Sequence, residues 1–314
     1  MPIAWLAAFL LFDSVFRSVP AAPVLLAAGD IASCDGGGDE ATALLLDAVQ
    51  GTIVALGDTV YPDGTADEYR DCFDPSWGRH RDRIRPVPGN HEYHTDVASP
   101  YFDYFGEAAG DRAKGYYSFV VGSWHVVALN TECEPAGGCG EGSPQYEWLR
   151  HELAESTAAC TIALMHTPRF SSGPRGESLW LEPFWDVMHD AGVELVLSGD
   201  DHHYERFAPQ GAGGEPDPVQ GLRQFVVGTG GIGLNAIGSP LPNSEARNAD
   251  SHGLLRLALH PSSYEWQFLP VQGRTFTDTG SEPCHEASRP KSFAPISRQW
   301  QDRGRTHGWD AVPG

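Results

Sequence analysis

Positive charge is scarce in this sequence. Its 314 residues include 21 lysines and arginines against 42 aspartates and glutamates, which gives a formal net charge of −21 at pH 7. Stable binding to a nucleic-acid backbone depends on clustered cations, so we expect no nucleic-acid partner. The same negative field would repel a small phosphorylated substrate unless its site held concentrated positive charge, and bound metal ions are the usual source.

Long apolar runs are also missing. The run IAWLAAFLLF at residues 3–12 is too short to span a bilayer but long enough for the core of a signal peptide. Small residues follow at Ala21 and Ala22, yet no lysine or arginine precedes the run and Asp13 closes it. Residues 1–22 are therefore interpreted as either a signal peptide or an N-terminal extension, and we expect no stable membrane span.

None of the six cysteines has the CxxC spacing of a metal site. Their even number favours disulfides, and Cys133 and Cys139 bracket the glycine-rich sequence EPAGG as a short disulfide loop would. Free buried thiols are the alternative. The cysteines and the N-terminal run together favour a secreted or extracytoplasmic protein, and a cytoplasmic location stays open.

The sequence has no internal repeat and no long low-complexity linker. With 41% hydrophobic residues the chain can bury a full core, and the pattern does not break from Pro23 to about Cys284, so we expect one domain over residues 23–285. Residues 286–314 carry several basic and few apolar side chains, which predicts a basic, poorly ordered tail.

Short apolar runs alternate with helical patterns, which is typical of an α/β protein. The runs predict five strands, within residues 23–30, 51–58, 85–90, 160–166 and 193–200. A helix is predicted between the first two, with a buried face formed by Ala41, Leu44, Leu45, Ala48 and Val49. Residues 116–130 and 252–268 predict hairpins, and a further helix is expected to begin at Ser143.

Each of the five predicted strands ends in a side chain that can bind a metal ion. In open α/β sheets, ligands gather at these carboxyl ends. A single Gly-Asp after a strand is usually a turn or a helix cap, but three of them, with an Asn-His and a Met-His, favour a site. Mixed oxygen and nitrogen ligands suit Fe, Mn or Zn, and more than four suit two ions that share a carboxylate. The candidates are Asp30, Asp58, Asn90, His166 and Asp200, with Tyr61 and His202 close behind two of them.

Five blocks of the sequence resemble those of the calcineurin-like metallophosphoesterases in order and spacing: GDIASC, GDTVY, GNHEY, LMHTPRFSSG and HHYER. The tyrosine of GDTVY and the ending YER are similar to those of purple acid phosphatases. The resemblance covers roughly residues 23–280. It implies a four-layer α/β/β/α sandwich, two mixed β-sheets flanked by helices, with a dinuclear metal centre at the strand ends. Because few residues precede Asp30, we expect the compact kind of purple acid phosphatase, without an extra N-terminal β-domain.

The resemblance also implies a role for each matched residue. Asp58, Asn90 and His91 would be the catalytic residues, with His91 beside the substrate phosphate; a turn residue is the alternative for His91. Arg169 could bind phosphate oxygens or lie in a solvated loop. Tyr61 could instead be a core or lid aromatic. The first metal would be held by Asp30, Asp58, Tyr61 and His202, and the second by Asn90, His166 and the bridging Asp58.

The stretch GDDHHYER departs from the family pattern, because Asp200 stands where a histidine is expected. If the chain leaves its strand extended, Asp200 and His202 point to the same side, and Asp200 can replace the missing ligand. This would shift the second site toward Fe, Mn or Mg and away from Zn. The competing interpretation is that Asp200 is too short and the second ion is weak or lost. In the extended chain, Asp201 and His203 would face away from the site, toward solvent.

The function implied by the resemblance is hydrolysis of phosphate monoesters by a metal-activated hydroxide. The cofactors would be Fe(III) beside the tyrosine and a divalent ion, Fe, Mn or Zn, and the substrate a small phosphorylated molecule. Two alternatives stay open: a Mn or Zn phosphodiesterase of the same superfamily, and a non-catalytic metal-binding relative impaired by Asp200. The sequence does not define the oligomeric state.

Overall fold

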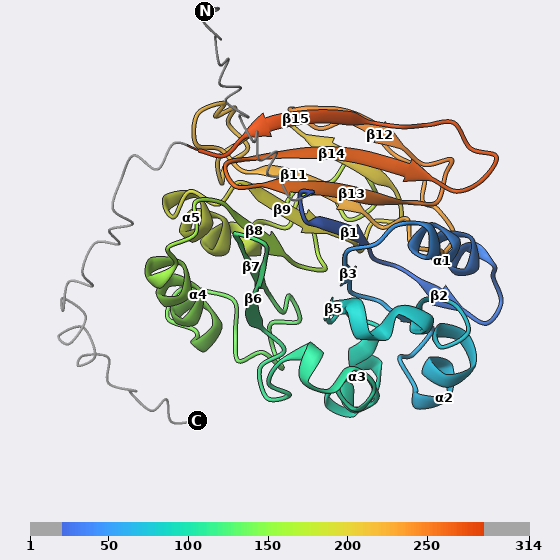
Figure 1. Ribbon diagram of the computed structural model, residues 1–314. Helices are drawn as coiled ribbons and strands as arrows, with labels where there is room; N and C mark the ends of the chain where they lie inside the picture. The colour runs from blue at the N-terminus through green and yellow to red at the C-terminus, as the bar shows by residue number, and fades with distance from the viewer. Residues whose placement is uncertain (1–20, 286–314) are drawn as a thin grey trace, which may run out of the picture.

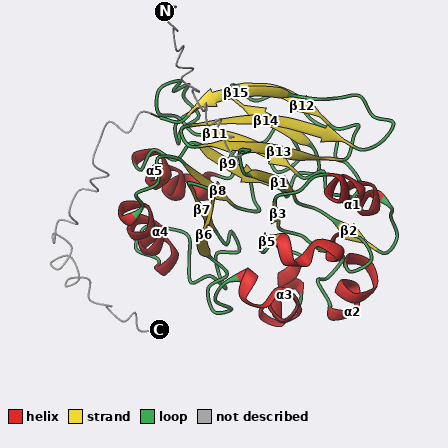
Figure 2. Ribbon diagram, in the orientation of Figure 1, coloured by secondary structure: helices red, strands yellow, loops and turns green. Residues whose placement is uncertain are grey.

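The computed structural model describes residues 21–285. In these residues, two mixed β-sheets form the centre of the fold, with helices on either side of them (Figures 1 and 2). The predicted fold class, a mixed α/β sandwich of four layers, is confirmed. The N-terminal run and the basic tail that the sequence suggests lie outside the described residues.

The first sheet has six strands in the order β15-β14-β13-β1-β3-β5. Strands β1, β3 and β5 are parallel, and β13 to β15 add an antiparallel edge next to β1. The predicted hairpin at 252–268 is the β13–β14 pair. The strands are β1 (Val24–Ala28), β3 (Thr52–Leu56), β5 (Ile84–Val87), β13 (Gly253–His260), β14 (Ser263–Pro270) and β15 (Thr279–Pro283).

The second sheet has seven strands in the order β12-β10-β11-β9-β8-β7-β6. Its central strands β7, β8, β9 and β11 are parallel, and the predicted hairpin at 116–130 is the antiparallel β6–β7 pair. The strands are β6 (Tyr117–Val121), β7 (Trp124–Ala128), β8 (Thr161–Leu164), β9 (Leu195–Ser198), β10 (Tyr204–Phe207), β11 (Arg223–Val227) and β12 (Ser244–Asn248). Two further short strands, β2 (Ala32–Ser33) and β4 (Val60–Tyr61), pair with each other.

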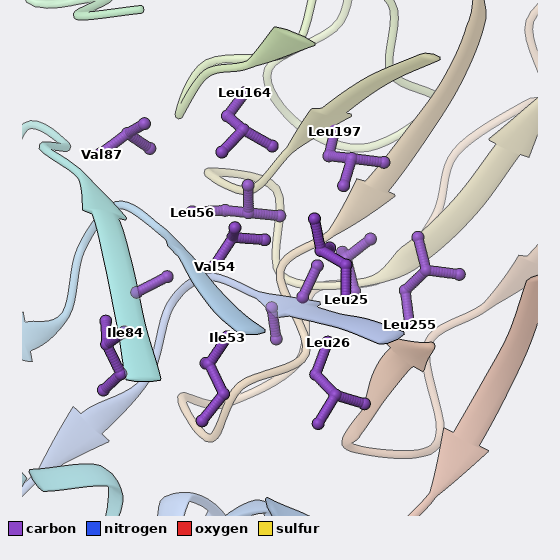
Figure 3. Close-up of a cluster of buried hydrophobic side chains, with 14 of the residues drawn as sticks. Leu25, Leu26, Ile53, Val54, Leu56, Ile84, Val87, Leu164, Leu197 and Leu255 are labelled. Carbon is purple, nitrogen blue, oxygen red and sulfur yellow. The ribbon is translucent and has the colours of Figure 1, made fainter. Parts of the chain in front are cut away.

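Alternate residues of the second sheet belong to two different hydrophobic clusters, as expected for a sheet buried on both faces. Val126 and Ile162 pack in the cluster that includes the first sheet, whereas Val127 and Ala163 pack in the one that includes helices α4 and α5. Figure 3 shows the first cluster, where Leu56 of β3, Leu164 of β8 and Leu197 of β9 lie near one another. The helices are α1 (Gly38–Ala48), α2 (Ala66–Glu68), α3 (Ser99–Phe105), α4 (Pro144–Glu155) and α5 (Glu182–Asp190). Ser143 caps α4 through its hydroxyl, which accepts from Tyr146 N, so the predicted start of this helix is confirmed.

Helix α1 is where the sequence predicts it, but its predicted buried face is right only in part: Leu45 and Val49 are partly buried and pack against the core, whereas Ala48 is exposed. Thr42, Ala43 and Leu46 are buried, whereas Leu44 is 61% exposed. The Thr42 hydroxyl donates to Gly230 O (2.6 Å) and accepts from Trp77 Nε1 (2.9 Å). A polar side chain with satisfied hydrogen bonds therefore occupies the buried face, which apolar periodicity alone cannot reveal.

All six cysteines form disulfides: Cys34–Cys72, Cys133–Cys139 and Cys160–Cys284. The predicted short loop at Cys133–Cys139 is confirmed, and the alternative of free thiols is wrong. The bond at Cys160–Cys284 ties the segment after β15 to the start of β8. Among residues 21–285, no helix combines the length and apolar character needed to cross a membrane.

Candidate metal centre

The ends of parallel strands from both sheets meet at one place. Asp30 and Asp58 follow β1 and β3 of the first sheet, and His166 follows β8 of the second. One ligand atom from each of these three buried side chains lies within 4.8 Å of the other two. The structure thus brings together residues that are up to 136 positions apart in the sequence because the carboxyl ends of these strands, two in one sheet and one in the other, lie next to each other.

The three Gly-Asp endings share an unusual backbone. Asp30, Asp58 and Asp200 have positive φ angles of 60°, 48° and 68°, a left-handed conformation that non-glycine residues rarely adopt. The glycine of the second ending is required sterically, since a Cβ on Gly57 would lie 2.4 Å from His166 Nδ1. Backbone strain of this kind is concentrated at functional sites.

One half of the centre is built around the Tyr61 hydroxyl. Its oxygen lies 2.9 Å from both Asp30 Oδ1 and Asp58 Oδ2, which compete for its single proton, and 3.3 Å from His202 Nε2. His202 Nε2 is also 3.3 Å from Asp30 Oδ1, while its Nδ1 is 2.9 Å from Gly233 O. This carbonyl orients the ring so that Nε2 faces the carboxylates, an arrangement common for histidines that bind metals.

The other half is built around His166, which is fully buried. Its Nε2 lies 3.3 Å from Asp58 Oδ2, 3.3 Å from Asn90 Oδ1 and 3.6 Å from Asp200 Oδ1. Its Nδ1 faces Leu56 O at 2.7 Å, which again directs Nε2 inward. Asp58 Oδ2 thus contacts residues of both halves, which is the geometry expected of a shared ligand.

The donor set fits metal ions. Asp30, Asp58 and Asp200 are at most 5% exposed, and so many buried carboxylates need compensating positive charge. Carboxylate, imidazole, amide and phenol donors face one another here, which is a set suited to first-row transition ions. The residues present are therefore able to hold metal.

Protons take the place of such cations where no metal is bound. Burial opposes ionisation of Asp58, yet the charge of His166 outweighs it and lowers the pKa of Asp58 to about 2. Burial would lower the pKa of His202, but the bond to Asp30 and its charge raise that pKa to about 9. The pKa of His166 is raised well above its ordinary value, against burial, by Asp58 and Asp200. Burial and the charges of Asp30 and Asp58 raise the pKa of Tyr61. Metal binding and proton release are consequently coupled.

His91 lies at the open side of the centre, with its side chain 24% exposed. Its backbone N–H donates to Asp58 Oδ1 (2.8 Å), and its Nε2 is 3.7 Å from Asp58 Oδ2. The ring packs against Tyr61 with centroids 4.1 Å apart, and Nδ1 contacts Pro62 O. An imidazole held in this way can reach a group bound beside Asp58.

Glu92 is a site residue that the sequence reasoning missed, although it belongs to the matched block GNHEY. It is fully buried, and its carboxylate accepts hydrogen bonds from Asp58 N (2.9 Å), Thr59 N (2.8 Å) and Gly89 N (2.7 Å). Burial and the Asp58 charge raise the pKa of Glu92, and the donors at Gly89 and Thr59 oppose the rise. The side chain fastens the loop after β3 to the loop after β5.

The part of the stretch GDDHHYER that lies between β9 and β10 is not extended. Asp201 N bonds to Gly199 O (2.8 Å) and His203 N to Asp201 O (2.7 Å), so two three-residue turns follow each other. Asp200 still faces His166, but Asp201 and His203 are fully buried, so their predicted exposure to solvent is wrong. The reason is that both are hydrogen-bonded within the fold, Asp201 to Ser171 and His203 to Glu205.

Two arginines follow His166 in the chain, and only the one that the sequence did not indicate contacts a predicted ligand. Arg169, the predicted phosphate-binding residue, is 1% exposed, and its guanidinium contacts Ala212 O (2.8 Å), Glu177 (3.5 Å) and the Phe170 ring. None of these is a predicted ligand, so the structure does not bring Arg169 into the centre through a direct contact. Arg175 does contact it, since its Nη2 lies 2.6 Å from Asp200 Oδ1. No motif marks Arg175 in the sequence.

Comparisons with known proteins show the family of the chain. The family model described as calcineurin-like phosphoesterase matches residues 23–204. Purple acid phosphatase 22 of Arabidopsis thaliana is 32% identical over 158 residues, which cover 45% of this chain and 34% of that protein. The chain spans less than half the length of the curated relatives it matches.

Solved structures share the fold. Purple acid phosphatase PPD1 from yellow lupin seeds superposes with a TM-score of 0.73 at 18% identity, covering 88% of this chain and 57% of that chain. GAP50, described as the anchor in the inner membrane complex of Plasmodium, superposes with a TM-score of 0.60 at 16% identity, covering 82% and 88%. At these identities the likeness concerns the fold alone.

Proposed function

Because the chain belongs to the calcineurin-like phosphoesterase family, we propose that it is a metal-dependent phosphomonoesterase of the purple acid phosphatase type. The observation that carries the proposal is the convergence of Asp30, Asp58 and His166 at one buried edge, with Tyr61 and His202 in contact with the carboxylates. The likeness to purple acid phosphatases in sequence and fold supports it.

Two metal ions fit the two halves of the centre. The first ion would be held by Asp30, Tyr61 and His202, and the second by Asn90 and His166. Asp58 would be shared by both ions, and Asp200 would be available to the second. Together the ions would supply an activated water and neutralise charge on the phosphoryl group. Fe(III) on the Tyr61 side, where a phenolate can bind it, and a divalent ion on the other are our proposal for their identity.

The chain's own residues have separate tasks in this proposal. Glu92 and the carbonyls of Leu56 and Gly233 hold the ligands in position. His91, at the open side, stabilises charge on the phosphoryl oxygens or gives a proton to the leaving oxygen. A small phosphorylated molecule is the proposed substrate. Three disulfides support a secreted or extracytoplasmic location.

Elemental metal analysis with a visible spectrum tests the centre, run on the purified protein and on Asp200→His. The histidine variant suits the backbone, because histidine tolerates positive φ better than most side chains. Two metals per chain including iron, with a tyrosinate band, are expected for the parent protein. One metal in the parent that rises to two in the variant would mean that Asp200 is not an effective ligand.

Hydrolysis of p-nitrophenyl phosphate and of bis(p-nitrophenyl) phosphate tests the reaction. We expect a higher kcat/KM for the monoester. A higher value for the diester would favour a phosphodiesterase. No turnover of either ester with metal bound would favour a binding protein. The fold is compatible with that role, since GAP50, described as an anchor, shares it.

A further inference from the structure

We propose that Arg175 binds the phosphoryl group of the substrate and favours monoesters over diesters, an inference that rests on the proposed phosphoesterase function. The residue lies in the loop after β8, in a segment that sequence reasoning did not single out. Its side chain is 49% exposed, so it is open to a ligand while one of its nitrogens is held at the centre.

The guanidinium is held by Asp200. Arg175 Nη2 lies 2.6 Å from Asp200 Oδ1, and the same oxygen lies 3.6 Å from His166 Nε2. A single carboxylate oxygen thus links the arginine to the metal centre, and a phosphoryl group bound there is within reach of the guanidinium. Only some of the five N–H groups of an arginine are needed for this ion pair, and the others remain available to phosphate oxygens.

The loop that carries Arg175 is anchored by two buried carboxylates. Arg175 N donates to Asp201 (3.2 Å to Oδ2), which also accepts from the Ser171 hydroxyl. Glu205, with no exposed surface, accepts from Ser172 N (2.8 Å) and from the Ser172 hydroxyl (2.6 Å). Asp201 and Glu205 both belong to the stretch that supplies Asp200 and His202. The anchors therefore fix the base of the arginine relative to the ligands, which reduces the entropy lost when it binds phosphate.

The guanidinium of Arg175 supplies positive charge in a negatively charged region. In a chain of net charge −21, a phosphate approaching three buried aspartates meets a repulsive field. Among the arginines and lysines of residues 21–285, only Arg175 forms an ion pair with one of the predicted metal ligands. A guanidinium also keeps its charge at any working pH.

The expected preference for monoesters follows from charge and geometry. A phosphate monoester dianion presents three terminal oxygens and about two negative charges. Two of the oxygens can face the metal centre, and the third remains for Arg175. A diester presents two terminal oxygens and one charge, so it gains less from an additional cation. Removing Arg175 should therefore weaken monoester binding more than diester binding.

Binding of inorganic phosphate, measured by calorimetry on the metal-loaded full chain, is the primary test because it needs no turnover. Arg175→Ala is expected to raise the Kd for phosphate about 10- to 100-fold, the loss typical of a charge-assisted hydrogen bond. Arg175→Lys should recover part of this loss. Arg79→Ala is the matched control, since Arg79 also makes an exposed ion pair with an aspartate, Asp47, and should leave the Kd unchanged.

Steady-state kinetics provide the second test. Arg175→Ala should raise KM for p-nitrophenyl phosphate by a similar factor, change KM for bis(p-nitrophenyl) phosphate several-fold less, and leave metal content unchanged. An unaltered phosphate Kd, or an equal effect on both esters, would overturn the inference. Loss of metal from Arg175→Ala would overturn it too, because the arginine would then act on the metal site. If the parent hydrolyses neither ester, the proposed function fails, and the calorimetry still decides whether Arg175 binds phosphate.

Discussion

Replacing Glu92 by glutamine removes one charge and almost no volume, and it should nevertheless destabilise the metal centre. The carboxylate accepts from the backbone N–H groups of Asp58, Gly89 and Thr59 and from the Thr59 hydroxyl. In glutamine, one oxygen becomes an NH₂ group that can only donate. The least costly orientation turns this group toward the Thr59 and Tyr69 hydroxyls, which can rotate to accept, and it leaves Thr59 N–H unpaired in the core.

The size of the stability loss follows from the hydrogen bonds that Glu92→Gln removes. One buried backbone N–H without an acceptor costs about 1–3 kcal/mol, and the bonds that remain lose their charge assistance. Relief of the repulsion between Glu92 and Asp58 returns part of this energy. The net expected loss is about 2–4 kcal/mol in the free energy of unfolding, together with weaker metal binding because the loops after β3 and β5 are no longer fastened together.

Urea unfolding of chelator-treated protein measures the stability change, and elemental analysis after metal reconstitution measures the second effect. The control is Glu107→Gln, an exposed glutamate whose replacement should change the unfolding free energy by less than about 0.5 kcal/mol. If Glu92→Gln unfolds at the same urea concentration as the control and keeps its metal, the assigned role of Glu92 is refuted.

Further substitutions and pH test the division of roles. Asp58→Asn should remove metal and hydrolysis together, whereas His91→Ala should keep the metal and lose most of kcat; equal metal loss in both variants, by elemental analysis, would contradict this. Tyr61→Phe should retain the fold by circular dichroism and abolish any visible tyrosinate band, and a surviving band would exclude Tyr61 as its source. In chelator-treated protein, folding raises the pKa of His202 from 6.5 to about 9. Its stabilising contribution, up to about 3 kcal/mol, is therefore complete below pH 6.5 and lost as the pH rises through 9. Urea unfolding across this window should show that loss in the parent, and an equal loss in His202→Ala would argue against it.

Five of the strands could be predicted because each is a short, buried apolar run that ends in a polar side chain, whereas the order of the strands in the sheets was not predicted, nor were strands such as β12 and β15, which carry polar and exposed residues. Those endings also indicated candidate side chains, since ligands gather at the carboxyl ends of parallel strands, although the endings meet across two sheets rather than along one. The short disulfide loop at Cys133–Cys139 followed from spacing alone. The resemblance to the metallophosphoesterases added the sandwich of two sheets, which periodicity does not contain.

Other features depend on contacts between distant residues, which one sequence does not reveal. Thr42 occupies the buried face of α1 because it bonds to Gly230 and Trp77, both far from it in the chain. Arg175 contacts Asp200, and its loop is anchored by Asp201 and Glu205, all of which lie 25 or more residues later in the chain. The left-handed backbone at the Gly-Asp endings is likewise invisible, because the same dipeptide is common in ordinary turns.

Charge balance connects the centre with the loop beside it. Three buried carboxylates, Asp30, Asp58 and Asp200, face three groups that can be cationic, His166, His202 and Arg175. When metal ions bind, the two imidazoles must release their protons to become ligands, so the affinity for metal should rise with pH until they are neutral. Arg175 cannot release its charge in this way. In the proposed centre it is therefore the one cation of the three that would remain after metal binding, and an entering phosphoryl group would meet both the metal ions and the guanidinium.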